Sequence, residues 1–367
     1  MRHSSLYLNW YIRVPNVKYD LRSSGVTYPK YPLTLGEVDL NANCLDKAAE
    51  LLSQRYKVKP ECIFILSEGT SGQNARIIRC IAERDKKKEA IIEYPTYEPL
   101  LRQVQEYYPM VKRLERRKVE NYRLDAEQFR KIASEKTGLL VLTNPHAPSG
   151  AIADRNELEE IITVAKEYGI YVLCDEIYAE FERESVPTIF SVDEELGIST
   201  TSFTKAYGLG GLRLGMALAQ KKLIESLYAD VIYMIGGGSN LVLITAIEFL
   251  TKGREHLEKH KQKWKRLRKE TEEWLNEKGL EFFPGKIGVT YWVETPIGDT
   301  YKWMNMQAIP KHSLALVPGA FFLFKNGYEL EKTNMLRLGL GNVNPDKPNL
   351  TEAFEAVEKA FKTYAPS

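Results

Sequence analysis

Cysteine and histidine are scarce in this sequence, which limits the metal and disulfide chemistry that it can support. The 367 residues include four cysteines, Cys44, Cys62, Cys80 and Cys174, and no two of them have C-x-x-C spacing. The five histidines include no H-E-x-x-H pair. We therefore predict neither a metal site nor a disulfide framework.

Strong net charge and long apolar runs are also missing. The formal net charge is only +2, and the one basic run, KHKQKWKRLRK at 259–269, is followed directly by ETEEW, as on a solvated helix face. No segment is apolar over the ~20 residues that cross a bilayer, and the first residues lack the apolar core of a signal peptide. These absences predict a cytoplasmic protein that binds neither nucleic acid nor a membrane.

What the sequence does contain is an alternation of short apolar runs and amphipathic stretches. Buried-strand patterns occur at CIFIL (62–66), EAIIEY (89–94), GLLVLTN (138–144) and GIYVLCDEIY (169–178), and helical patterns lie between them. This alternation predicts an α/β fold with a mostly parallel sheet that helices cover on both faces.

The second part of the chain has a different pattern. Residues 241–279 form a long helical tract, and we expect a bend or break near Gly253. Beyond it, 280–294, 313–322 and 334–341 have the patterns of short strands, and 350–364 has that of a closing helix. We predict an extended N-terminal arm over 1–40, a large domain over 41–255 and a smaller α+β domain over 256–367.

Four clusters of small and polar residues follow predicted strands, at the sheet edge where open α/β folds bind ligands. In EGTSG, Gly69, Thr70 and Ser71 precede a helix, and backbone N–H groups there suit a phosphate. An ordinary helix cap has the same composition. In TNPHAPSG, two prolines make a rigid loop after Asn144, which could also be only a turn.

The third and fourth clusters contain a carboxylate and a lysine. In VLCDEIY, Asp175 ends an apolar strand, where it either meets a positive partner or caps a helix. In TSFTKAYGLGGLRLG (201–215), small and aromatic neighbours would leave Lys205 poorly hydrated and easily deprotonated. A neutral lysine is a nucleophile for a carbonyl carbon, and Ser202, Thr204 and Arg213 could bind a phosphate.

Together the clusters fit one ligand. It has a phosphate, a cationic ring nitrogen for Asp175, a phenolic oxygen for Asn144 and Tyr178, and an aldehyde for Lys205. These are the groups of pyridoxal 5′-phosphate, which enzymes bind through a lysine Schiff base and an aspartate at the pyridine nitrogen. We predict this cofactor.

The sequence resembles the fold-type I, aspartate-aminotransferase-like pyridoxal-phosphate enzymes, the class I/II aminotransferases, over nearly its whole length. The stretch from Ser202 to Gly215 matches that family's cofactor-lysine signature. EYPTY, which ends at Tyr97, lies before this stretch, and LRLGLG, which contains Arg337, lies after it, in the family's order. The resemblance implies the fold-type I architecture, with a large cofactor-binding domain and a smaller C-terminal domain.

The resemblance also implies roles for the matching residues. Lys205 would form the Schiff base and transfer the proton, Asp175 would keep the ring nitrogen protonated, and Arg337 would clamp the substrate carboxylate. The other implied cofactor contacts are those of Asn144 and Tyr178 with the ring O3′, of Tyr97 with the ring face, and of Gly69, Thr70, Ser71, Ser202, Thr204 and Arg213 at the phosphate. We expect Gly25, in LRSSGV, and Asn144 to border the substrate beside Arg337.

Two features depart from the family pattern. The motif N-P-x-N-P-x-G has Ala147 in place of its second asparagine. The N-terminal region is short, and it has no identifiable tyrosine that would reach the phosphate of a neighbouring subunit.

The activity that the resemblance implies is transfer of an amino group from an α-amino acid to a 2-oxo acid, by a homodimer. The three glycines of YMIGGGSN (233–240) would permit this segment to cross between subunits, and a hinge before the long helix is an equal alternative. A lyase, decarboxylase or amino-acid cyclase on the same scaffold stays open, because motifs do not encode substrate orientation. A transcription regulator would need a DNA-binding helix-turn-helix, for which we find no pattern. Aromatic residues in the arm favour an aromatic or other uncharged substrate side chain over a dicarboxylate; they are Tyr7, Trp10, Tyr28 and Tyr31. A dicarboxylate stays open, because in this family an arginine for the distal carboxylate often comes from the neighbouring subunit.

Overall fold

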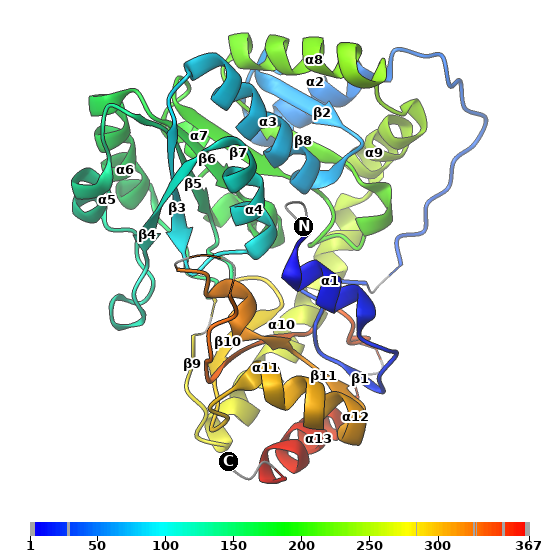
Figure 1. Cartoon of the computed structure of the whole chain (residues 1–367). Coiled ribbons are helices and arrows are strands. Elements are labelled where there is room, and N and C mark those ends of the chain that lie inside the picture. Colours follow the sequence, from blue (N-terminus) through cyan, green and yellow to red (C-terminus); the bar gives the residue numbers. More distant parts are fainter. Residues whose placement is uncertain are drawn as a thin grey trace.

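The computed structural model describes residues 4–27, 30–283, 285–325, 327, 329–346 and 349–363, without the side chains of Arg254, Lys259 and His260. Its main feature is a seven-stranded sheet in the order β2-β8-β7-β6-β5-β3-β4 (Figure 1). The strands are β2 (Ile63–Leu66), β3 (Glu89–Tyr94), β4 (Met110–Glu115), β5 (Thr137–Thr143), β6 (Tyr171–Asp175), β7 (Gly197–Thr201) and β8 (Gly215–Leu218). Only β8 pairs antiparallel with its neighbours in this sheet, so the predicted mostly parallel sheet is confirmed.

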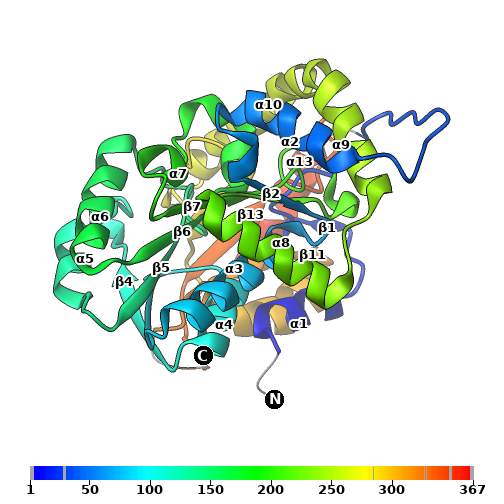
Figure 2. The same ribbon diagram turned by 90° about the horizontal axis from the view of Figure 1, so that it is seen from above.

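Helices cover both faces of this sheet because alternate residues of each strand point to opposite sides. In β5, Leu139 and Val141 belong to the core beneath α3 (Gly69–Asp85), α4 (Glu98–Tyr107) and α8 (Lys221–Ile235). Leu140 and Leu142 belong to the opposite core, beneath α5 (Ala126–Ile132), α6 (Arg155–Tyr168) and α7 (Ile189–Val192). Figure 2 shows the two groups of helices on opposite sides of the sheet.

A smaller antiparallel sheet lies below the large one in Figure 1, in the order β12-β13-β10-β9. Its strands are β9 (Phe282–Phe283), β10 (Thr290–Glu294), β12 (Val317–Pro318) and β13 (Met335–Gly339), and its helices are α10 (Arg254–Glu277), α11 (Thr300–Trp303), α12 (Ile309–His312) and α13 (Leu350–Lys362). Trp274 of α10 stacks on Phe354 of α13, with ring centroids 4.1 Å apart. The predicted smaller α+β part is present, and its boundaries stay predictions.

The break expected in the long helical tract is confirmed at Gly253. Helix α9 (Asn240–Lys252) ends at this glycine, and α10 begins at the next residue. A Cβ atom at Gly253 would lie 2.4 Å from the ring of Phe249, so a larger residue would not fit. Within the described part of the chain, no helix combines the length and the apolar composition that a membrane crossing requires.

We predicted an extended arm over residues 1–40, but part of this segment is helical. Helix α1 (Leu6–Arg13) begins at Ser5, whose Oγ accepts a hydrogen bond from the Leu8 N–H. The helix forms because Tyr7 and Trp10, three residues apart, are both buried beneath it. Farther along, β1 (Tyr19–Asp20) pairs in parallel with β11 (Leu314–Ala315) of the small unit.

Helix α1 connects the two units of the molecule. On the side of the large unit, the backbone N–H of Leu6 donates to Glu98 of α4 at 3.2 Å, and Ser5 binds the same carboxylate. On the side of the small unit, Trp10 Nε1 donates to Asn305 Oδ1 at 2.9 Å. Between β1 and α2 (Cys44–Tyr56), the described residues form a loop that extends away from the body of the molecule (Figures 1 and 2).

Candidate active site

A cavity of about 480 Å³ lies where the carboxyl ends of the large sheet's central strands face the small unit. Thr143 at the end of β5 and Asp175 at the end of β6 line this cavity, as does Lys205 in the turn that follows β7. Arg337 of β13 reaches the same cavity from the small unit. Among the described residues, no group of three or more His, Cys, Asp or Glu side chains could hold a metal ion.

Lys205 points its amine into a largely desolvated part of this cavity, where Nζ donates a hydrogen bond to Ser24 Oγ at 3.0 Å. Burial lowers the pKa of the amine, and the guanidinium groups of Arg337 and Arg213 act in the same direction. Tyr7 and Asp175 oppose the shift without cancelling it. The lowered pKa favours the neutral amine, which is the form that attacks an aldehyde carbon.

Two hydrogen bonds hold the carboxylate of Asp175 at the end of β6. Oδ2 accepts from Asn74 Nδ2 at 2.8 Å, and Oδ1 accepts from the backbone N–H of Ile177 at 3.1 Å. Burial nevertheless raises the pKa of Asp175 to about 6. A carboxyl that is this desolvated is stabilised in its charged form by a cation in the cavity. The sequence analysis missed Asn74, although it follows Thr70 by one turn of α3.

The first turn of α3 and the turn before β8 lie against each other and contribute polar groups to the cavity wall. A Cβ atom at Gly69, where φ is +70°, would lie 2.3 Å from Arg213 Nη2, so the guanidinium lies directly against the helix start. Thr70 Oγ1 is buried and has no hydrogen-bond partner among the described residues, and Ser71 and Thr204 also line the cavity. A helix N-terminus beside a guanidinium and free hydroxyls suits a phosphate.

Two of the predicted phosphate ligands, Gly69 and Ser202, are not among the described residues that line the cavity, and Ser202 has a different contact. It is fully buried, and its Oγ accepts a hydrogen bond from the Thr204 N–H at 3.1 Å. In the structure it therefore holds the turn that carries Lys205.

Arg337 is buried with part of its hydrogen-bonding capacity unused. Nη2 donates to the Tyr7 hydroxyl at 3.0 Å and to the backbone oxygen of Arg22 at 2.9 Å, whereas Nε has no partner in the part of the chain that the structure describes. Although burial works against the charge, Tyr7 and Tyr178 raise the pKa of Arg337, so the group stays cationic. It is available to bind a carboxylate.

Two predicted tyrosines, Tyr97 and Tyr178, line the cavity. Burial raises the pKa of both phenols, so both stay protonated and can donate a hydrogen bond. The ring of Tyr97 packs edge-on against that of Tyr7, with centroids 5.7 Å apart.

Asn144 is not among the described residues that line the cavity, and its predicted contact with the cofactor stays a prediction. Its Nδ2 donates to the Ala153 backbone oxygen at 3.1 Å, and its Oδ1 accepts from the Ala153 N–H at 3.0 Å. These two bonds occupy both ends of the amide, which is 1% exposed. Instead, Ala147 lines the cavity. The side chain of Asn144 therefore fastens the proline loop to the backbone of Ala153.

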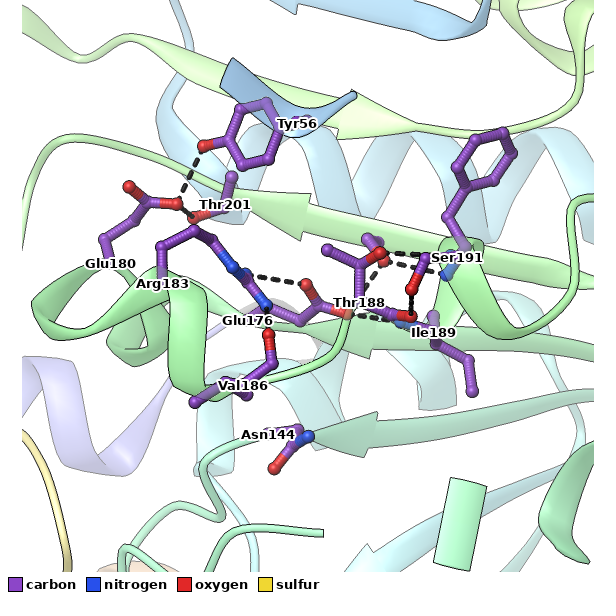
Figure 3. Close-up of polar contacts among 12 residues, drawn as sticks. Tyr56, Asn144, Glu176, Glu180, Arg183, Val186, Thr188, Ile189, Ser191 and Thr201 are labelled. Carbon is purple, nitrogen blue, oxygen red and sulfur yellow. Dashed lines mark hydrogen bonds and ion pairs between the residues drawn. The ribbon is translucent and has the colours of Figure 1, made fainter. Parts of the chain in front are cut away.

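A buried polar network fixes the turn that carries Asp175 and Tyr178 (Figure 3). Glu176 accepts hydrogen bonds from Arg183 at 2.9 Å, from the Ile189 N–H at 2.8 Å and from Ser199 Oγ at 2.7 Å. Glu180, at the other end of the turn, accepts from the Tyr56 hydroxyl at 2.7 Å. Asn144 lies apart from this network in the same view. These hydrogen bonds fix the backbone on which Asp175 and Tyr178 stand.

Gly25 is not among the described residues that line the cavity, and its predicted place beside the substrate stays a prediction. A Cβ atom there would lie 2.8 Å from Lys205 Cδ and 3.2 Å from Lys205 Cα. The next residue, Val26, donates its N–H to the Lys205 backbone oxygen at 2.8 Å. Gly25 therefore lets the N-terminal segment pack directly against the lysine.

The sequence analysis missed most of the wall that the N-terminal segment contributes. Its lining residues are Tyr7, Leu8, Tyr11, Arg22, Ser23 and Ser24. Of the other arm aromatics, Trp10 points toward Asn305, Tyr31 binds Glu248 at 2.8 Å, and Tyr28 lies outside the described residues. Only the spacing of Tyr7 and Tyr11 on one face of a helix could have identified part of this wall.

A comparison with known proteins assigns the chain to a family. The sequence model of the family described as aminotransferase class I and II matches residues 14–357. The chain belongs to this family. The match includes every predicted site residue described above, from Gly25 to Arg337.

Individual relatives are more distant. The putative aminotransferase YugH of Bacillus subtilis is 29% identical over 206 residues, which cover 55% of this chain and 53% of that protein. An aspartate aminotransferase of Pyrococcus horikoshii is 26% identical over 271 residues, which cover 68% of this chain and 63% of that protein. The chain thus spans little more than half the length of the curated relatives it matches.

A solved structure described as a PLP-dependent aminotransferase from Streptococcus suis superposes on all of this chain and is itself covered completely. The TM-score is 0.84 at 22% sequence identity, which establishes a shared fold.

Aminotransferases of class I and II use pyridoxal 5′-phosphate, and the residues of the cavity fit this group. The unpartnered Thr70 Oγ1, with Arg213 and the start of α3, would hold the phosphate. Asp175 would hold the ring nitrogen, and Lys205 would bind the aldehyde carbon. The unpartnered Nε of Arg337 would be left for the substrate.

Proposed function

We propose that the protein is a pyridoxal-phosphate-dependent aminotransferase that moves the amino group of an α-amino acid to a 2-oxo acid in two half-reactions. The observation that carries this proposal is one cavity with complementary groups for both cofactor and substrate. Burial lowers the pKa of the Lys205 amine and raises that of the Asp175 carboxyl. Arg213 and Arg337 provide two separate sites for anions.

The residues of the chain have distinct tasks in this reaction. When bound, the cofactor supplies an electron-accepting ring for the negative charge left on the substrate Cα after its proton is removed. Lys205 would take that proton from Cα and return it, since its lowered pKa leaves the amine able to accept a proton. Asp175 would keep a proton on the ring nitrogen. Arg337 would fix the substrate carboxylate through parallel N–H bonds.

A half-reaction screen tests this proposal. The enzyme is mixed with one amino acid at a time, and the absorbance of the bound cofactor is followed while the 2-oxo acid product is measured. We expect conversion of the cofactor to its amino form together with one equivalent of 2-oxo acid. In a separate sample that has met no amino acid, borohydride reduction followed by peptide mass spectrometry should place the cofactor on Lys205.

The alternative is a lyase, decarboxylase or cyclase, because Lys205 and Asp175 serve these reactions equally well. The same screen separates them. An amine, a cyclised amino acid or a 2-oxo acid that accumulates over many turnovers, without conversion of the cofactor, would replace transamination by that reaction.

We also propose that the protein acts as a homodimer. The last turn of α8 exposes consecutive apolar side chains, among them Ile232 (68% exposed) and Tyr233 (86% exposed). Leu40, on the extended loop, is also exposed, and the backbone oxygen of that residue accepts from Asn240 at 2.7 Å. Such a surface is typical of protein–protein contact. A second copy related by a twofold axis would bury this surface twice.

The position of this surface supports a shared active site. Gly238, just beyond α8, lies near Leu66 at the end of β2, and that strand leads into the first turn of α3.

Light scattering of the wild type should give the mass of a dimer. Tyr233→Asp should give monomers and weaken cofactor retention, whereas Tyr107→Asp, a similar change at a partly exposed tyrosine of α4, should leave the dimer intact. A wild-type monomer with full activity would contradict the proposal.

The predicted cytoplasmic location is part of this proposal. Fractionation of cells that produce the protein would test it.

A further inference from the structure

The end of the cavity next to Arg337 is built by the N-terminal segment. Tyr7, Leu8 and Tyr11 of α1 line it, together with Arg22. The Tyr7 hydroxyl and the backbone oxygen of Arg22 both accept hydrogen bonds from Arg337 Nη2. An amino acid whose carboxylate binds Arg337 would therefore bring its side chain close to these residues.

Arg22 is cationic, but its charge is already compensated. Its Nε and Nη2 donate to the two oxygens of Asp20, both at 2.8 Å, in a bidentate pair. Its Nη1 donates to the Tyr11 backbone oxygen at 2.8 Å, and its guanidinium lies 4.6 Å from the centroid of the Tyr11 ring. The arginine side chain is largely buried among these partners.

The remaining charges on the cavity wall have other tasks in the proposed reaction. Lys205, Asp175 and Arg213 would bind the cofactor, and Arg337 would bind the substrate α-carboxylate. With Arg22 paired to Asp20, the wall of the described residues offers no uncompensated cation to a second substrate carboxylate. What it offers is the apolar surface of two tyrosine rings and Leu8.

We propose that this end of the cavity selects α-amino acids with uncharged, preferably aromatic side chains, and that Asp20 is a specificity-determining residue because it neutralises Arg22. The inference rests on the proposed aminotransferase function. Aromatic side chains pair favourably with tyrosine rings. A dicarboxylic amino acid would have to compete with Asp20 for Arg22, or leave its distal carboxylate desolvated and unpaired.

The test compares the wild type with Asp20→Asn, which keeps the shape of the side chain and removes its charge. For each enzyme, single-turnover rates are measured with L-phenylalanine and L-aspartate. The affinities of 3-phenylpropionate and succinate, which cannot react, are measured from the change in cofactor absorbance. We expect the wild type to prefer the aromatic member of each pair. We expect Asp20→Asn to shift both ratios about 10-fold or more toward the dicarboxylate, because Arg22 is then uncompensated.

Two further variants make the result specific. In Asp20→Asn/Arg22→Met the shift toward dicarboxylates should disappear, since the cation is gone. Glu352→Gln removes a carboxylate that pairs with Lys18 at 3.1 Å on the exposed side of the same segment, and both ratios should remain at the wild-type value.

A wild type that prefers aspartate and succinate would overturn the inference while leaving transamination intact. An unchanged ratio in Asp20→Asn would remove Asp20 from the selection. If no amino acid transaminates, the proposed function fails, and the binding of the two inert acids still decides whether the cavity prefers aromatic ligands.

Discussion

The wall of the cavity that the large sheet builds and the wall that the N-terminal segment builds are held in different ways. Asp175 and Tyr178 stand on a turn anchored by Glu176 and Glu180, which the buried network holds. Tyr7, by contrast, stands on an eight-residue helix that exposes Ile12 by 75%. The groups proposed for cofactor chemistry thus lie on a turn that buried hydrogen bonds hold in place. Those proposed for substrate selection lie on a short, partly exposed helix.

The largest effect is expected on the wall that the large sheet builds, from Lys205→Ala. This change removes the amine that would bind the aldehyde and move the Cα proton. We expect the half-reaction rate to fall by at least ~10²–10⁴-fold, the usual contribution of a proton-transfer group. Borohydride should then attach no cofactor to the peptide that contains residue 205. Retention of a comparable rate would show that Lys205 is not the proton-transfer residue.

Asp175→Asn should reduce the rate by about 10²-fold or more, because an amide cannot compensate a protonated ring nitrogen. The phosphate pocket at Thr70 and Arg213 is unchanged, so much of the cofactor should stay bound. Equilibrium dialysis and single-turnover kinetics measure the two effects separately. Equal losses of binding and rate would contradict the proposed division of tasks.

The pH dependence of cofactor binding should follow Asp175. Burial raises the pKa of this carboxyl from its ordinary 3.8 to about 6 in the protein without ligand. Below pH 6 the group becomes neutral and loses its attraction for the ring nitrogen, so cofactor affinity should decline as pH falls. Because the folded-state pKa is raised, the Asp175 carboxyl should also make the cofactor-free fold less stable as pH rises from about 4 to 6. Asp175→Asn should remove both dependences.

Gly25→Ala tests the seam between the two walls, because the added Cβ would lie 2.8 Å from Lys205 Cδ. Such overpacking costs roughly 1–3 kcal/mol, and we expect a corresponding loss of about 5- to 160-fold in the rate of cofactor attachment to Lys205. Gly36→Ala is the matched control, since a Cβ there meets nothing within 4 Å. Rapid mixing with pyridoxal 5′-phosphate measures the rate.

The smallest effect is expected on the N-terminal wall, from Tyr7→Phe. The change removes the hydroxyl that accepts from Arg337 and leaves the ring in place. A net hydrogen bond contributes about 0.5–1.5 kcal/mol, so KM for the amino acid should rise by roughly 2- to 12-fold, with kcat little changed. A large loss of kcat with an unchanged KM would instead place Tyr7 in the chemical step.

The sequence predicted the wall that the large sheet builds better than the N-terminal wall, for a physical reason. Asp175 and Lys205 follow strand patterns, and parallel strands bring their carboxyl ends to one edge of a sheet. Arg22 reaches the cavity only because β1 pairs with β11, almost 300 residues away in sequence, and no local pattern encodes that pairing. The hydrogen bonds of Asn144 with Ala153 were also not predictable from a local pattern. Which side chain of the proline loop faces the cavity depends on the path of the loop and on the backbone of Ala153.

The contacts of α1 with both units have a thermodynamic consequence for ligand binding. Glu98 accepts a hydrogen bond from the first turn of the helix, and Asn305 accepts one from Trp10 farther along it. Tyr7, between these two contacts, accepts a hydrogen bond from Arg337. A substrate that binds Arg337 more tightly when α1 is docked must stabilise the docked helix by the same coupling free energy. Amide hydrogen exchange within residues 6–13 would then report occupancy of the cavity, even for an acid that never reacts. Slower exchange on addition of 3-phenylpropionate is the expected sign of this reciprocity.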